Sequence, residues 1–116
     1  MSALADSAIM PIWRADEGAQ AALAVFTTGP HNCSKFLNGR VAGNVMSDTV
    51  GALTILQEQL PGLGGLVFTV PQDLLQPNFQ FPFSILLFAP FVTFTWTQGA
   101  APSTFLRATV SALPQL

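Results

Sequence analysis

The sequence predicts an all-β protein, an antiparallel β-sandwich or a jelly-roll-like barrel of about seven short strands. Apolar and polar residues alternate over several short segments, as they do in strands with one buried and one solvated face. Turn signals built from Gly, Pro, Asn and Asp separate these segments about every 8–12 residues. Ten Phe and two Trp supply aromatic bulk for the core of a 116-residue domain.

The clearest strand follows Pro90, where Val92, Phe94 and Trp96 alternate with three threonines. We expect these three side chains to face the core. The preceding residues 84–88 are apolar on both faces, which is typical of a strand covered from both sides. Pro90 cannot donate a ladder hydrogen bond, so it marks a corner or an edge. We expect this pair of strands to form the centre of the sandwich.

Other strands are expected, in chain order, at residues 22–28, 40–46, 52–57, 66–70, 79–84 and 104–111. Gly29-Pro30 is predicted to be a turn after the first of them, and Asn38-Gly39 a tight turn before the second. Pro82 argues for an edge or a bend. The residues expected to fill the core are Leu53, Ile55, Val92, Phe94, Trp96, Leu106 and Val110.

Residues 1–20 lack strand alternation and are expected to form an extended N-terminal arm, with residues 21–116 as the β-sandwich domain. The arm's apolar residues Ile9, Ile12 and Trp13, with Arg14 beside them, are predicted to anchor on a neighbouring subunit. An extended arm of this length reaches about 66–72 Å, beyond the span of the domain. The alternatives are a disordered tail and a first strand that folds back on its own sandwich.

The composition points to contacts with other proteins. Only 9% of the residues are charged, against about 25% in ordinary globular proteins, and 50% are hydrophobic. Large exposed apolar patches usually mark interaction sites, so we expect part of the surface to meet other protein. The alternative is an ordinary surface rich in Thr and Gln. The net charge is −2 and the four Lys and Arg are scattered, which argues against nucleic-acid binding.

No membrane span is expected, although residues 74–106 carry no charge. A transmembrane helix needs about 20 predominantly apolar residues in one run, and prolines and amide side chains interrupt this segment repeatedly. The first ten residues lack the basic start and the long apolar core of a secretory signal.

The titratable side chains predict neither an enzyme nor a metal or cofactor site. His31 and Cys33 could share a metal, but zinc takes three or four protein ligands and the sequence has no second His or Cys. A Cys–His nucleophile pair lacks an obvious orienting group. The single cysteine excludes an internal disulfide. We interpret Asp48 as a turn residue, and we expect Arg107 to be solvated or paired with an acidic group across a subunit contact.

Two segments resemble small virion proteins of tailed bacteriophages. The first is residues 43–57, Gly-Asn-Val-Met-Ser-Asp-Thr-Val-Gly-Ala-Leu-Thr-Ile-Leu-Gln. In that family one strand ends in Ser/Ala-Asp, and Gly-Thr-Leu opens a second strand that closes on Gln. The second segment, residues 89–106, begins Ala-Pro-Phe-Val-Thr-Phe-Thr-Trp and is similar to the family's closing strands. The family's Ser-x-Asp-Gly-x-x-Trp hairpin is replaced here by residues 58–62.

The resemblance implies a β-sandwich component of the virion. With the predicted arm, it leads us to expect a capsid cement (decoration) protein that stabilises an icosahedral head by binding its outer surface. The expected partners are further copies of the chain, as a homotrimer, and the major capsid protein. The expected location is the virion, after synthesis in the host cytoplasm. The alternative is a tail or baseplate accessory protein, or a carbohydrate-binding sandwich that docks glycans on Trp96 or Trp13.

Overall fold

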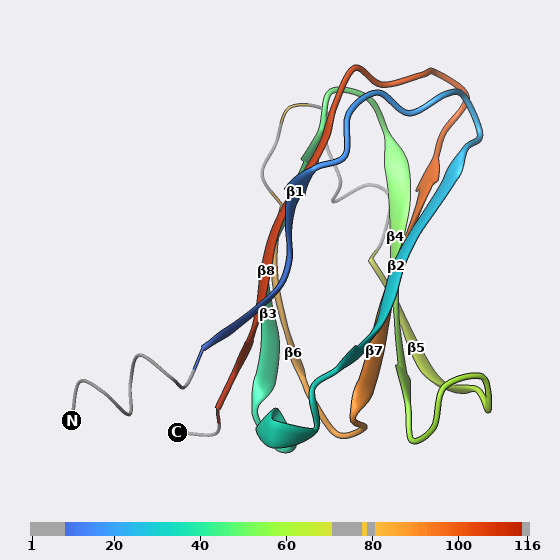
Figure 1. Ribbon diagram of the computed structural model, residues 1–116. Coiled ribbons are helices and arrows are strands. Elements are labelled where there is room, and N and C mark those ends of the chain that lie inside the picture. The colour runs from blue at the N-terminus through green and yellow to red at the C-terminus, as the bar shows by residue number, and fades with distance from the viewer. Residues whose placement is uncertain (1–8, 71–77, 79–80, 115–116) are drawn as a thin grey trace.

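The computed structural model describes residues 9–70, 78 and 81–114 and shows two antiparallel sheets packed face to face (Figure 1). The strands are β1 (Met10–Asp16), β2 (Val25–Asn32), β3 (Arg40–Ser47), β4 (Gly51–Glu58), β5 (Gly65–Val70), β6 (Phe81–Leu86), β7 (Phe91–Gln98) and β8 (Leu106–Leu113). Each sheet has four strands, in the orders β1-β8-β3-β6 and β2-β7-β4-β5. The predicted all-β sandwich is confirmed, with eight strands in place of about seven.

The chain folds as one long hairpin rolled into two layers. β1 pairs with β8, β2 with β7, β3 with β6 and β4 with β5, each time antiparallel. β3 also pairs with β8, and β4 with β7, which completes the two sheets. This connectivity is that of a jelly roll. The β4–β5 loop is the tip of the rolled hairpin, and it lies at the same end of the sandwich as the 3-10 turn η1 (Ser34–Phe36) (Figure 1).

The core lies between the sheets and is filled by alternate residues of the strands. On β7, Val92, Phe94 and Trp96 are at most 2% exposed, while the threonines between them reach the surface. All seven residues expected in the core are buried. Trp13 and Phe36 join them in the same cluster. The alternation therefore identified the inward faces of β4, β7 and β8.

Residues 10–16, expected within the N-terminal arm, form β1, which is the alternative of a first strand that folds back on its own sandwich. This strand pairs with β8 from Met10 opposite Ala112 to Asp16 opposite Arg107. Its register shifts between Pro11 and Trp13, and such an irregularity interrupts the simple alternation by which a strand is recognised in a sequence. Residues 1–8 of the expected arm lie outside the described residues.

β6 lies at the edge of its sheet, and not at the centre of the sandwich as expected for residues 84–88. Its outward residues, Leu86 among them, are exposed, and its inward residues are only partly buried. The edge position expected from Pro82 is confirmed. Residues 79–80 of the expected strand 79–84 lie outside the described residues.

β2 continues through Gly29-Pro30, where the sequence predicts a turn. The ladder between β2 and β7 shifts register between Thr28 and His31, so the two residues are accommodated as an irregularity within the strand. The Gly-Pro dipeptide therefore forms an irregularity within β2 and not a turn, because β2 pairs with β7 on both sides of it.

Candidate functional site

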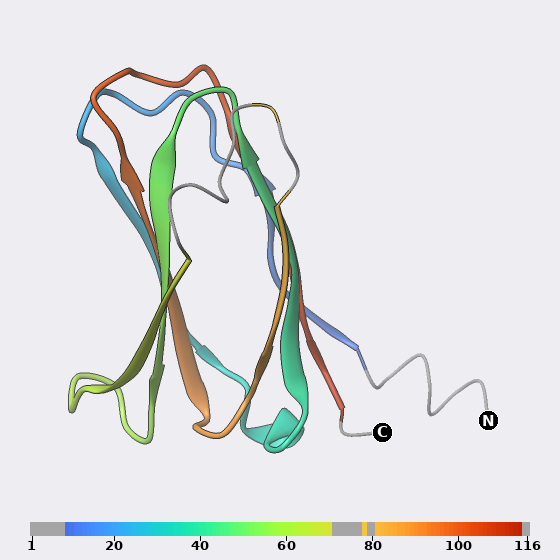
Figure 2. The ribbon, with the colours of Figure 1, turned by 180° about the vertical axis from the view of Figure 1, so that it is seen from behind.

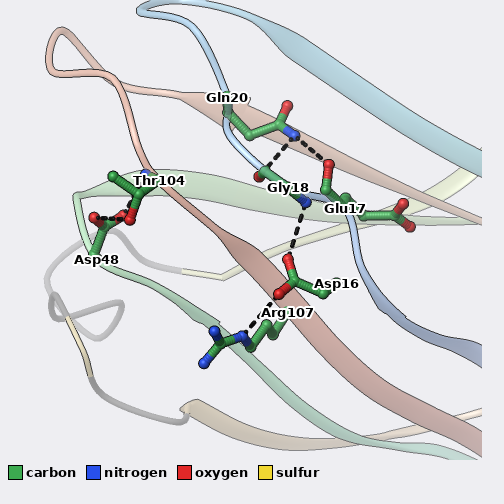
Figure 3. A network of polar contacts seen from close by, with 7 residues as sticks. All are labelled: Asp16, Glu17, Gly18, Gln20, Asp48, Thr104 and Arg107. Carbon is green, nitrogen blue, oxygen red and sulfur yellow. Dashed lines mark hydrogen bonds and ion pairs between the residues drawn. The ribbon is translucent and has the colours of Figure 1, made fainter.

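A polar network holds together the end of the sandwich where the β1–β2, β3–β4 and β7–β8 loops meet (Figure 3). Nε of Arg107 on β8 donates to Oδ2 of Asp16 on β1 at 3.0 Å, and Asp16 Oδ1 accepts the Gly18 N–H at 2.9 Å. In the same view Asp48 accepts the Thr104 backbone N–H at 2.9 Å and the Thr104 hydroxyl at 2.6 Å. Each carboxylate thus ties a loop to a segment distant in sequence.

The chemistry of this network is structural. The Gly18 N–H, and after it Arg107, lower the pKa of the Asp16 carboxyl, and the Thr104 hydroxyl lowers the pKa of Asp48. Both groups therefore stay ionised at neutral pH, whereas a carboxylic general acid needs a raised pKa. Among residues 9–70, 78 and 81–114, no group of three or more His, Cys, Asp and Glu is placed to hold a metal. Arg107 pairs with Asp16 of its own chain, and its side chain remains 54% exposed.

His31 and Cys33 serve as packing groups. Cys33 is fully buried, and burial raises the pKa of its thiol to about 11, so the thiolate that nucleophilic chemistry needs is scarce at neutral pH. Burial lowers the pKa of His31, whose Nε2 lies 3.1 Å from the Thr28 hydroxyl. The imidazole packs 6.0 Å from the ring of Phe94.

Two buried glutamines join segments that the strand ladders do not. Gln57 on β4 donates to the Leu86 carbonyl at 2.9 Å and accepts the Phe88 N–H at 3.0 Å, which links the two sheets. Gln98, 1% exposed, donates to the Thr49 hydroxyl at 2.6 Å and to the Ala101 carbonyl at 2.8 Å, and it accepts the indole N–H of Trp96 at 2.9 Å. In the described part of the chain every buried side-chain N or O atom has a hydrogen-bond partner. The interior polar groups are therefore used by the fold itself.

A set of large apolar side chains on β5 and on the loop before it is exposed to solvent. Their exposed fractions are 57% for Leu60, 73% for Leu63, 58% for Leu66, 54% for Val67 and 41% for Phe68. We call these five residues the β5 surface. The sequence has no charged residue between Glu58 and Asp73, so no charged side chain of this segment solvates the surface. Large exposed apolar surface is uncommon on soluble monomers and marks interaction sites, which makes this segment a candidate contact.

The register of β5 explains why the surface has two faces. Leu66 lies opposite Gln57, and Phe68 lies opposite Ile55, so these residues point towards the core side of the sheet. Gln57 and Ile55 are buried there, yet Leu66 and Phe68 remain exposed because β5 is the outermost strand. Val67 points to the outer face and is exposed as well. Neither face of β5 is covered by the described residues.

The loop that presents Leu60 and Leu63 is held in place by Glu58. One carboxylate oxygen of this buried residue, Oε2, accepts the N–H of Gly62 at 3.0 Å and that of Gly64 at 2.8 Å. Both glycines have positive φ, 88° and 78°, a conformation that glycine adopts without steric cost. The two leucines are thus displayed on an ordered turn that projects from the end of the sandwich opposite the polar network (Figure 1, Figure 2).

The four expected arm anchors do not form one exposed group. Ile9 is 55% exposed, Ile12 is partly buried against the core, and Arg14 is exposed on β1. Trp13 is only 3% exposed. Its ring packs against Phe26 and Phe94 of its own chain, so it anchors β1 to its own sandwich.

Neither tryptophan offers a platform for a sugar ring. Trp13 and Trp96 are 3% and 2% exposed, whereas glycan docking on either residue requires an accessible indole face. The structure therefore gives no support to glycan docking on these two side chains.

Comparison with protein-family models, with curated proteins and with solved structures finds no match to this chain. Among the described residues, no helix is long and apolar enough to cross a membrane.

The composition predicts exposed apolar surface but does not place it on β5. The available signal was the uncharged stretch between Glu58 and Asp73, with apolar residues at 66, 67 and 68 in succession. Such a run is also typical of a strand buried on both faces. Only the strand order distinguishes the two cases, because it places β5 at an edge.

Proposed function

We propose that this chain is a virion structural protein of the capsid cement type, which stabilises an icosahedral head by binding its outer surface through protein–protein contacts. The observation that carries the proposal is the β5 surface, five exposed large apolar side chains in a segment without charge. Removal of such a surface from water favours association by about 25 cal/mol for each Å² of apolar area. The mechanism is contact area and needs no reactive group.

Two features of the molecule support this function. The eight-stranded jelly roll is an architecture that viral capsid proteins and lectins use, which is an argument by analogy at the level of the fold. The polar side chains Asp48 and Thr104, and Asp16 and Arg107, at the other end of the sandwich are hydrogen-bonded within the chain. On a shell, many identical weak contacts act together, and multivalency makes their sum resistant to internal pressure.

The test is co-sedimentation of the tagged protein with empty heads that lack it. Binding should saturate at a fixed ratio of protein to head. Because the β5 surface is uncharged, binding should persist in about 1 M NaCl, where the Debye length is about 3 Å. Absence of saturable binding would overturn the proposal.

A matched pair of variants locates the contact. Leu63 is 73% exposed in the β4–β5 loop, and Leu23 is 71% exposed in the β1–β2 loop. These two loops lie at opposite ends of the sandwich (Figure 1). We expect Leu63→Asp to weaken head binding at least about tenfold, since a charge in an apolar contact must be desolvated. Leu23→Asp should leave binding unchanged. Equal loss in both variants would show that the β5 surface is not the reason for binding.

A further inference from the structure

The four edge strands of the two sheets differ in how they are protected against pairing with another strand. The edges are β1 and β6 in one sheet and β2 and β5 in the other. Natural proteins protect such edges with prolines, charges and bulges. Each edge strand except β5 carries at least one of these devices.

The protected edges have specific features. β1 contains Pro11 and a register shift, and it carries the ion-paired Asp16. β2 contains Pro30 within its own register shift. β6 contains Pro82 as its second residue, where a ladder donor is missing.

β5 has none of these devices. Its sequence, Gly-Leu-Val-Phe-Thr-Val, holds no proline and no charge, and its ladder with β4 runs without a register shift from Leu53–Val70 to Glu58–Gly65. Among the described residues, no strand pairs with its outer edge. A regular, apolar and unprotected edge is a template for adding a further strand.

We propose that β5 pairs antiparallel with β5 of a second copy of this chain across a twofold axis, which joins two four-stranded sheets into one continuous sheet. This proposal rests on the proposed function only in taking the β5 surface to be a protein contact. A head-to-tail ring built through the β5 edge would require β5 to pair with one of the three protected edges. Self-pairing of β5 is the one edge-to-edge combination in which neither strand carries a protecting device, and the absence of charge removes like-charge repulsion between the copies.

The twofold axis restricts the register. Residues directly opposite one another share a face, so a residue must lie opposite one of the same parity. A residue therefore lies opposite its own copy at the axis, and the fullest overlap of the six-residue strand places Val67 opposite Val67, or Phe68 opposite Phe68, at the centre. In both cases the exposed core-side residues Leu66 and Phe68 of the two copies become neighbours on one face of the joined sheet. The pairing thus covers the edge and shields the inward side chains that β5 leaves exposed.

The first experiment is the solution mass of the full chain by light scattering over a range of concentrations. The monomer has a mass of 12.3 kDa, and we expect a concentration-dependent species of twice that mass. Val67→Lys should raise the dimer dissociation constant at least about tenfold, because it places like charges close together across the axis. Val25→Lys is the matched control: Val25 is 64% exposed on β2, the opposite edge of the same sheet, and the variant should dimerise as the wild type does. Circular dichroism of both variants checks that they fold.

A second experiment reads the register directly. Opposed residues of an antiparallel pair lie about 4.5–5.5 Å apart at Cα, within the range that a disulfide spans. Under mild oxidation either Val67→Cys or Phe68→Cys should give a crosslinked dimer, and Val25→Cys should not. The native Cys33 is buried and does not compete.

The results separate this inference from the proposed function. A twofold dimer that fails to bind heads supports the pairing and overturns the cement function. A monomer that binds heads, with binding lost in Val67→Lys, shows that β5 contacts the capsid protein and overturns the pairing. A wild-type trimer, a monomer at all concentrations, or a dimer unaffected by Val67→Lys overturns it as well.

Discussion

Replacement of Trp13 by alanine tests whether β1 belongs to the core of its own sandwich. Trp13 is 3% exposed, and its ring lies 6.0 Å from Phe26 and 5.6 Å from Phe94 between ring centroids. Its indole N–H donates to Glu17 at 2.8 Å. Truncation of a buried Trp to Ala costs about 3–5 kcal/mol. Since the total stability of a domain is about 5–15 kcal/mol, this change removes a large share of it.

The assay is urea unfolding followed by tryptophan fluorescence, which comes from Trp96 alone in the Trp13 variants. All variants are compared at one chain concentration because association would also stabilise the fold. With a slope of about 2 kcal/mol per M, the midpoint of Trp13→Ala should fall by about 2 M. Trp13→Phe retains an aromatic ring but loses the N–H donor, and we expect a loss of about 1–2 kcal/mol. This milder variant keeps the test decisive should the alanine variant fail to fold.

Arg14→Ala is the control, because Arg14 follows Trp13 on β1 and is exposed. Exposed substitutions away from special features usually change stability by less than about 0.5 kcal/mol. If Trp13→Ala unfolds at the same urea concentration as the wild type, Trp13 does not support this core. The residue would then belong to an arm that contacts a neighbouring subunit.

Three further changes test the interior. Gln98→Leu should lower the free energy of unfolding by about 1–3 kcal/mol in urea, because it leaves the indole N–H of the buried Trp96 without an acceptor. Gly43→Ala should lower the melting temperature by several degrees, about what 1–3 kcal/mol of overpacking implies, since a Cβ at Gly43 would lie 1.9 Å from the Thr109 carbonyl oxygen. Stability should also decline as the pH falls below 6.5, because burial lowers the pKa of His31 in the folded chain while the unfolded chain binds the proton at 6.5.

Each of these three expectations has its own check. Thr97→Leu alters the exposed neighbour of Gln98 and should change the unfolding midpoint little. An unchanged melting temperature for Gly43→Ala would mean that β3 and β8 are not packed as described. His31→Gln should remove the decline in stability between pH 6.5 and the lowered pKa of His31 in the folded chain. Persistence of the full decline in that variant would assign it to other groups.

Much of the fold could be read from the sequence, because residue alternation reports which side of a strand meets the core. It located β3, β4, β7 and β8 closely and identified core residues such as Phe94 and Leu106, which are fully buried. Low charge correctly indicated apolar surface, and exposed Leu63 and Phe68 are its clearest members. These properties are local, since each depends on a residue and its neighbours in the chain.

What only the tertiary structure decided is which strands lie side by side. β1 is a strand because β8, far away in the sequence, supplies its hydrogen bonds across a bulge. The apolar residues 84–88 were expected at the centre of the sandwich, but they lie in the edge strand β6 and in the segment that follows it. The equally apolar β5 is also an edge strand, and its large side chains are exposed. Alternation specifies the faces of a strand but not its neighbours, and whether an apolar side chain is buried depends on the neighbours that cover it.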